Sequence, residues 1–144
     1  MDNNYRHRTH YVSRNSEFGE VWRHMIPKPK KFNKTTAKNK LDKLFSLKIR
    51  ARGNQLEGKD TIKSGGNLQC LHIFGRANLR LRWEPRNAIC GDAGHHIYYT
   101  YHPMEWYSLI TKYFGEELKW LEAHRNEKIK FNELYYIEKL NELV

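Results

Sequence analysis

The chain has 144 residues, 39% of them hydrophobic, and a formal net charge of +10. That length supports one hydrophobic core and not two independent ones, so we expect a single domain with tails. No apolar run approaches the length of a membrane span, and the opening MDNNYRHRTH lacks the apolar stretch of a secretory signal. The sequence therefore predicts a cytoplasmic protein with no membrane partner.

The positive charge is concentrated in the first half of the chain. Residues 1–63 contain 16 Lys and Arg against 6 Asp and Glu, residues 64–102 contain 4 against 2, and residues 103–144 contain 6 against 8. Such an asymmetry is typical of a protein that binds a polyanion, and nucleic acid is the first candidate.

Residues 1–34 show no sustained helical or strand periodicity, and IPKPKKFNKTT combines prolines with lysines. This pattern predicts a basic, partly flexible arm that lies along phosphates. A packed extension is the alternative, because the arm also carries Tyr11, Phe18, Val21 and Trp22, which could dock onto the core. The domain proper is predicted over 35–144.

A helix is predicted from about Thr36 to Arg52, with Thr35 or Thr36 as its N-cap and Gly53 as its stop. Its apolar stripe consists of Leu41, Leu44, Phe45 and Ile49. The other face carries candidate nucleic-acid contacts, although each is individually more typical of a solvated helix face: Lys40, Lys43 and Arg50.

Two strands are predicted next, Leu68 to Phe74 and a return strand from Arg82 to Cys90. The loop between them and the start of the return strand supply arginines that suit phosphate oxygens: Arg76, Arg80 and Arg82. Arg76 is the preferred phosphate contact, whereas Arg80 and Arg82 are equally compatible with surface charge.

Helices are predicted from near Asp92, from Pro103 to Gly115, and over EELKWLEAHRNEK and FNELYYIEKLNELV. Their aromatic stripes indicate core packing. A homodimer interface built from the last helix is the minor alternative.

In the central segment, fourteen residues separate His72 from Asn87, and eight separate Asn87 from His96. This spacing resembles the signature of HNH nucleases. A neutral imidazole at His72 suits a general base for phosphodiester hydrolysis. Asn87 suits an amide that clamps the loop and orients the base, and His96 suits a metal ligand on the following helix. Asn87, Asp92 and His95 are further candidate metal ligands, with His96 preferred.

The sequence around this triad resembles phage HNH proteins of the recombination-protein NinG type. The similarity rests on LQCLHIFGR, RW and NAIC, with looser likeness in LDKLFSLKIRARG and HPMEWYSLITKYFGEEL, and covers roughly residues 37–121. The resemblance implies an α+β fold with a ββα-metal core, in which a β-hairpin carries the base His72 and a helix carries the metal ligand His96. It also implies phage origin and the cytoplasm of the host cell.

Two departures from the family pattern affect the metal. Leu71 occupies the position before the base, where most HNH nucleases carry a second ligand, and it cannot bind a metal. Many relatives also hold zinc with two cysteine pairs, whereas this chain has only Cys70 and Cys90, and has Asp92 and His95 where the second pair falls. The sequence thus excludes a four-cysteine zinc site and leaves the catalytic ion's ligands undefined.

We therefore predict a metal-dependent HNH endonuclease that hydrolyses DNA in recombination, branched-DNA processing or nicking. The expected cofactor is Mg²⁺ or Mn²⁺, with Zn²⁺ or Ni²⁺ as alternatives, and the expected partner is duplex or branched DNA. The competing hypothesis is a non-catalytic nucleic-acid-binding module on a degenerate HNH scaffold.

Overall fold

The computed structural model describes residues 27, 30–63 and 65–144. Contacts divide the chain into two units, Met1–Phe32 and Asn33–Val144. Most of the predicted arm over 1–34 lies outside the described residues. The fold below is that of the second unit.

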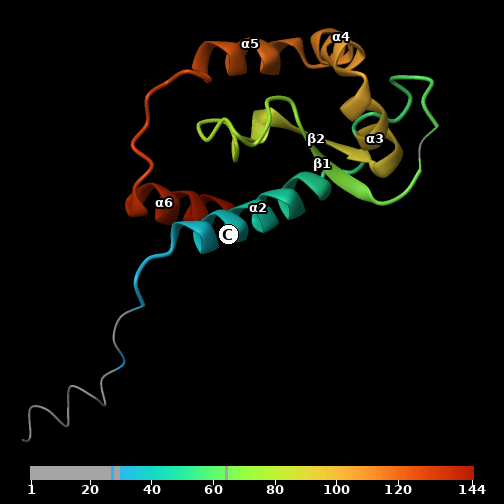
Figure 1. Ribbon diagram of the computed structural model, residues 1–144. Coiled ribbons are helices and arrows are strands. Elements are labelled where there is room, and N and C mark those ends of the chain that lie inside the picture. Colours follow the sequence, from blue (N-terminus) through green and yellow to red (C-terminus); the bar gives the residue numbers. More distant parts are fainter. Residues whose placement is uncertain (1–26, 28–29, 64) are drawn as a thin grey trace, which may run out of the picture. The chain divides into compact units, whose positions relative to one another are not determined.

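The second unit is built from helices and one small sheet, which confirms the predicted α+β class. Its elements in chain order are α2 (Lys34–Arg50), β1 (Leu68–His72), the 3₁₀ turn η1 (Pro85–Asn87), β2 (Ala88–Asp92), α3 (Ala93–Tyr101), α4 (Pro103–Tyr113), α5 (Gly115–His124) and α6 (Glu133–Leu143) (Figure 1). None of the described helices is long and apolar enough to cross a membrane.

Helix α2 begins two residues before the predicted start because Asn33 is its cap. The Asn33 side chain accepts a hydrogen bond from the Thr36 amide at 3.0 Å, which satisfies one of the free N–H groups of the first turn. Every fourth residue of one face is buried: Ala37, Leu41, Phe45 and Ile49. Gly53 then turns the chain away with a φ of 76°, a conformation that glycine adopts at little cost.

Strands β1 and β2 are antiparallel, with Leu68 opposite Asp92 and His72 opposite Ala88. The return strand begins six residues later than predicted. Pro85 has no N–H to give to a strand ladder, and it starts the turn η1 instead. The residues between His72 and η1 therefore form a long loop, and only residues 88–92 return along β1.

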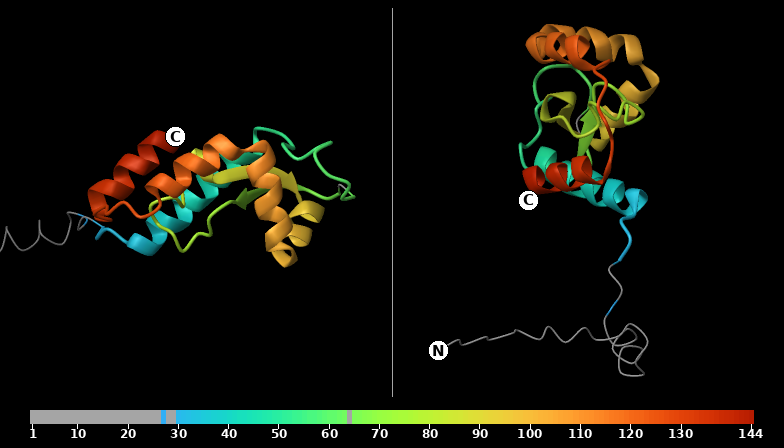
Figure 2. Two further views of the ribbon diagram at one scale, coloured as in Figure 1. Left: turned by 90° about the horizontal axis from the view of Figure 1, so that it is seen from above. Right: turned by 90° about the vertical axis from the view of Figure 1, so that its left-hand side faces the viewer.

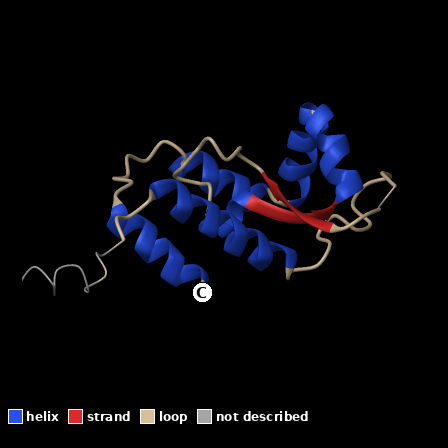
Figure 3. Cartoon of the chain, turned by 60° about the horizontal axis from the view of Figure 1, so that its bottom comes forward, coloured by secondary structure: helices blue, strands red, loops and turns tan. Residues whose placement is uncertain are grey.

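Alternation along the strands sends side chains to two separate cores. On one face, Cys70, Ala88 and Cys90 pack with α2 and with Tyr136 of α6. On the other face, Leu71 and Ile89 pack with Tyr99 of α3 and with apolar side chains of α4 and α5. The hairpin thus lies between two helical layers, with helices on both sides of the strands (Figures 2 and 3).

The later helices follow the sequence pattern. Asp92 caps α3 by accepting from the His95 amide at 2.9 Å, and Pro103 opens α4. Helix α6 packs beside α2, where Tyr136 is fully buried (Figure 1). A homodimer through α6 stays a prediction.

Candidate functional site

A groove of about 600 Å³ runs between α2 and β1. It brings together His72 and His96, which are 24 positions apart in the sequence, and two of the predicted phosphate contacts, Arg50 and Arg76. The remaining lining residues include Asp42, Phe45, Ser46, Asn67, Gln69 and Cys70. Most of these are small, polar or basic groups, so the groove suits an extended anionic ligand better than an apolar one.

His72 closes β1 and lies half-buried on one side of the groove. Its ring stacks on Phe45 of α2 with a centroid distance of 5.6 Å, and its Nε2 lies 3.0 Å from the carbonyl oxygen of Arg82. Because a carbonyl only accepts, Nε2 carries the proton and the lone pair is on Nδ1. Burial lowers the pKa of His72 below that of an ordinary histidine, and the bond to Arg82 opposes this only in part. A neutral imidazole near pH 7 suits a general base.

Asn87 is not among the residues that line the groove, and its side chain holds the loop that follows β1. Its Oδ1 accepts from the Phe74 amide at 2.8 Å, and its Nδ2 donates to the carbonyls of Phe74 and Leu81 at 2.9 and 3.0 Å. The side chain is 0% exposed. The predicted role of Asn87 in holding the loop agrees with these hydrogen bonds. The His72 imidazole, however, is oriented by the Arg82 carbonyl and not by the Asn87 amide. The amide does not line the groove, so a metal-ligand role does not suit it.

His96 lies exposed on α3 at the edge of the same groove. Its Nδ1 is hydrogen bonded to Oε1 of Gln69, an oxygen that only accepts, so Nδ1 carries the proton. Nε2 then keeps a lone pair for a ligand or a substrate proton. The partner Gln69 was not predicted, although its place three residues before His72 puts it on the same strand.

Asp92 and His95, the other candidate metal ligands, are buried and bonded to each other. His95 Nδ1 lies 2.9 Å from Asp92, and its Nε2 lies 3.0 Å from Asp60 in the loop before β1. Tyr99 also donates to Asp60 at 2.7 Å. Hydrogen bonds from Asp60 to His95 and Tyr99 therefore connect this loop to α3. Asp60 was missed because nothing in its polar loop sequence indicates that its carboxylate is bonded to His95 and Tyr99.

These contacts make stability depend on pH. Burial alone would lower the pKa of His95, but the bonds to Asp92 and Asp60 outweigh it and raise the pKa. The stabilisation by the charged imidazole is complete below the unfolded-state pKa, and it is lost as pH rises through the higher folded-state pKa. We expect urea denaturation to give a lower free energy of unfolding at pH 9 than at pH 6. His95→Gln should flatten this difference, and an unchanged pH dependence in that variant would contradict the assignment.

Asp42 organises the arginine end of the groove. It receives two hydrogen bonds from Arg82, at 2.9 and 2.6 Å, and one from the Trp83 indole at 2.9 Å. Burial would raise the pKa of Asp42, but these bonds and the nearby arginines lower it overall. Arg76 lies 3.7 Å from the same carboxylate and is 62% exposed. The sequence held a signal that was missed, since Asp42 is the one acidic residue of α2.

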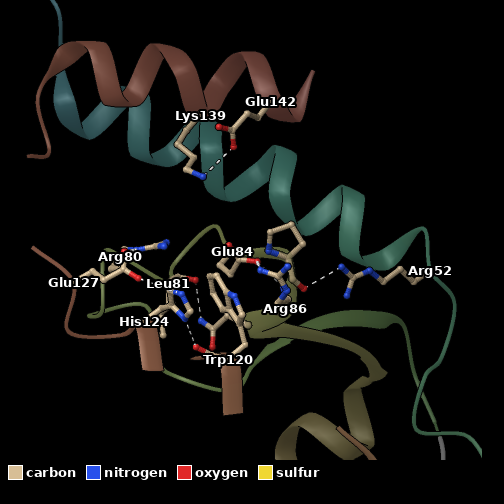
Figure 4. Close-up of polar contacts among 12 residues, drawn as sticks. Arg52, Arg80, Leu81, Glu84, Arg86, Trp120, His124, Glu127, Lys139 and Glu142 are labelled. Carbon is tan, nitrogen blue, oxygen red and sulfur yellow. Dashed lines mark hydrogen bonds and ion pairs between the residues drawn. The ribbon is translucent and has the colours of Figure 1, made fainter. Parts of the chain in front are cut away.

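The predicted phosphate contacts thus divide into two groups. Arg76 and Arg50 line the groove, and Lys40 and Lys43 are exposed on α2. Arg82 is committed to Asp42, and Arg80 pairs with Glu127 at 3.3 Å. Figure 4 shows Arg80 with Glu127 on one side of Trp120 and Arg86 over the Trp120 ring, at 4.2 Å from its centroid. Arg82 thus holds the loop to α2, and Arg80 holds it to the segment that follows α5, so a structural role suits both arginines better.

The groove does not form a complete site for a divalent ion. No group of three or more His, Cys, Asp or Glu suited to a metal occurs among the described residues. His96 offers one free nitrogen, while Asp42 is held by Arg82 and Trp83. Leu71 is 3% exposed and packs on the opposite face of β1 from His72. The predicted Mg²⁺, Mn²⁺, Zn²⁺ or Ni²⁺ therefore has an incomplete ligand set here.

Comparisons of the chain with protein-family models, with curated proteins and with solved structures find no match. A proposal about function therefore rests on the groove geometry and on the resemblance of the sequence motifs.

Proposed function

We propose that this protein is an HNH-type endonuclease that hydrolyses phosphodiester bonds of DNA in the groove between α2 and β1. The observation that carries the proposal is the pairing of His72 and His96 on one basic groove, with His72 held neutral by burial and oriented by the Arg82 carbonyl. Supporting it, β1, β2 and α3 follow one another in the order that a ββα-metal core requires.

In this proposal Nδ1 of His72 takes a proton from the attacking water. The bond from Nε2 to the Arg82 carbonyl then stabilises the imidazolium that forms, because the positive ring strengthens that bond. Asn87 acts indirectly on His72. It holds the carbonyl of Leu81, and the next residue, Arg82, supplies the carbonyl that orients the imidazole. Correct placement of the base thus depends on a buried amide that never touches substrate.

Arg76 is the residue best suited to hold the scissile phosphate. Its ion pair with Asp42 is long and exposed, and such pairs contribute only about 0–1 kcal/mol. Turning the guanidinium from Asp42 to a phosphate therefore costs little. Asp42 stays neutralised by Arg82 when Arg76 leaves, so the groove does not become acidic.

The test is a cleavage assay on supercoiled plasmid and on a synthetic four-way junction, with Mg²⁺, with Mn²⁺ and with EDTA. We expect nicking or junction cleavage that requires the added ion. Tight DNA binding without cleavage under every ion condition would instead support the second candidate function.

That second candidate is a nucleic-acid-binding module without catalysis. The incomplete ligand set favours it, since Leu71, Asp92 and His95 are all buried away from the groove. Both candidate functions use the basic groove and a nucleic-acid partner. They differ in that a binding module does not require His72 to accept a proton.

The arm should supply much of the non-specific affinity. Residues 1–32 carry 7 Lys and Arg against 3 Asp and Glu. Deleting them leaves the cap Asn33 in place, so α2 should still form. We expect the truncated protein to bind DNA with a shallower dependence of log affinity on log salt, because fewer counterions are released. An unchanged slope, measured by fluorescence anisotropy from 50 to 300 mM NaCl, would assign the arm a packing role.

A further inference from the structure

The groove has a cation at each of its ends. Arg76 lies at the end marked by Asp42, from which it is separated by 3.7 Å. Arg50 lies at the other end, two helical turns further along α2. Strand β1 runs alongside α2 in the opposite direction. The end of β1 lies near the Asp42 end of the groove, because His72 stacks on Phe45. The middle of the hairpin lies near Arg50, because the Sγ of Cys90, which pairs with Cys70, is 3.8 Å from the Arg50 carbonyl.

The separation of the two ends matches several nucleotides. Eight residues of helix from Asp42 to Arg50 span about 12 Å at a rise of about 1.5 Å per residue. One strand of B-form DNA advances about 3.4 Å per nucleotide along the helix axis, and an extended single strand advances further. This length therefore corresponds to about three or four nucleotides at most. The walls between the ends carry neutral polar groups, Ser46, Asn67 and Gln69, and the one carboxylate, Asp42, is paired with Arg82.

Arg50 is held in a position suited to a phosphate. Its Nε donates to the Ser46 carbonyl at 3.3 Å, and the residue is exposed and lines the groove. No acidic partner of Arg50 is found among the residues that the structure describes. The guanidinium is therefore available to an anionic ligand at no cost in broken ion pairs.

We propose that the groove is a track for a single nucleic-acid strand of three to four nucleotides, in which Arg50 grips a phosphate remote from the one at Arg76 and His72. The orientation relative to His72 rests on the proposed nuclease function, whereas binding of the strand does not. The ligand is thus a polynucleotide strand, and a mononucleotide or dinucleotide is too short to use both ends.

The track is tested by binding of a fluorescein-labelled 12-nucleotide single-stranded DNA in EDTA, measured by anisotropy with the full chain. Arg50→Ala is compared with Lys48→Ala, which removes an equal charge from the same last turn of α2 but does not line the groove. One lost phosphate contact should reduce the salt slope by about 0.7 and weaken binding about fivefold at 0.1 M salt. We expect this for Arg50→Ala and for Arg76→Ala, less than half of it for Lys48→Ala, and near-parent binding for Arg50→Lys.

The second measurement compares binding of oligonucleotides of two lengths. In NMR titrations, which detect millimolar binding, Arg50→Ala should weaken a hexanucleotide and leave a dinucleotide unaffected. Equal losses for Arg50→Ala and Lys48→Ala, or an equal loss for both oligonucleotides, would overturn the track. If the binding pattern holds but plasmid and junction remain uncut, the track stands and the nuclease function fails. If cleavage occurs but Arg50→Ala binds like Lys48→Ala, only the track fails.

Discussion

His72→Ala should abolish cleavage while leaving DNA affinity within about twofold of the parent. The imidazole acts on water and carries no charge near pH 7, so it contributes little to phosphate binding, whereas loss of a general base costs typically 10²–10⁴-fold in rate. The measurement is the single-turnover rate constant on the substrate that the parent cleaves, alongside anisotropy in EDTA.

The matched control is His102→Ala. His102 is an exposed histidine whose Nδ1 bonds to the Tyr98 carbonyl, and it does not line the groove. It should cleave like the parent. The pH profile gives an independent reading: because burial lowers the pKa of His72, the parent rate should rise with pH through an inflection below the usual histidine range and be flat from pH 7 to 8. Full activity in His72→Ala would remove the base assignment.

Asn87→Ala should cost about 3 kcal/mol or more of the free energy of unfolding. It leaves the Phe74 amide and the carbonyls of Phe74 and Leu81 without their partner in a buried site, and each such loss costs roughly 1–3 kcal/mol. Urea denaturation followed by circular dichroism measures the change.

Two further variants separate the causes. Asn87→Asp keeps an acceptor for the Phe74 amide but removes both donors and buries a carboxylate against two carbonyls, so it should destabilise at least as much. Asn39→Ala removes an exposed asparagine of α2 and should change stability by less than about 0.5 kcal/mol. A small effect of Asn87→Ala would show that the loop holds its shape without the amide.

Much of the fold was predictable because its signals are local. The apolar stripe of α2, Pro103 before α4 and Asp92 before α3 each act within one or two turns of chain. The return strand was placed too early because the alternating apolar residues Leu81 and Trp83 resemble a strand. They are buried instead within a loop that Asn87 and Asp42 hold, and the Asp42 contact comes from 41 residues away in the sequence.

The sequence indicated which kinds of residue form the site, but not which of the candidate residues reach it. Spacing suggested His72 and His96, and both line the groove. Spacing could not tell which neighbours are buried. His95 directly precedes the groove residue His96, yet its ring is buried and hydrogen bonded to Asp92 and Asp60. The division among the arginines depended on Asp42 and Glu127, acidic partners 34 to 47 residues away.

The Asp60, His95 and Asp92 network has a consequence for how this protein tolerates oxidants. Where a loop is tied to a helix by cysteine-bound zinc, peroxide or a strong chelator opens the tie. Here the same connection consists of carboxylates, an imidazole and a phenol, none of which peroxide converts to a disulfide. The junction between the loop and α3 is accordingly insensitive to redox state, and metal chelators such as EDTA leave it in place.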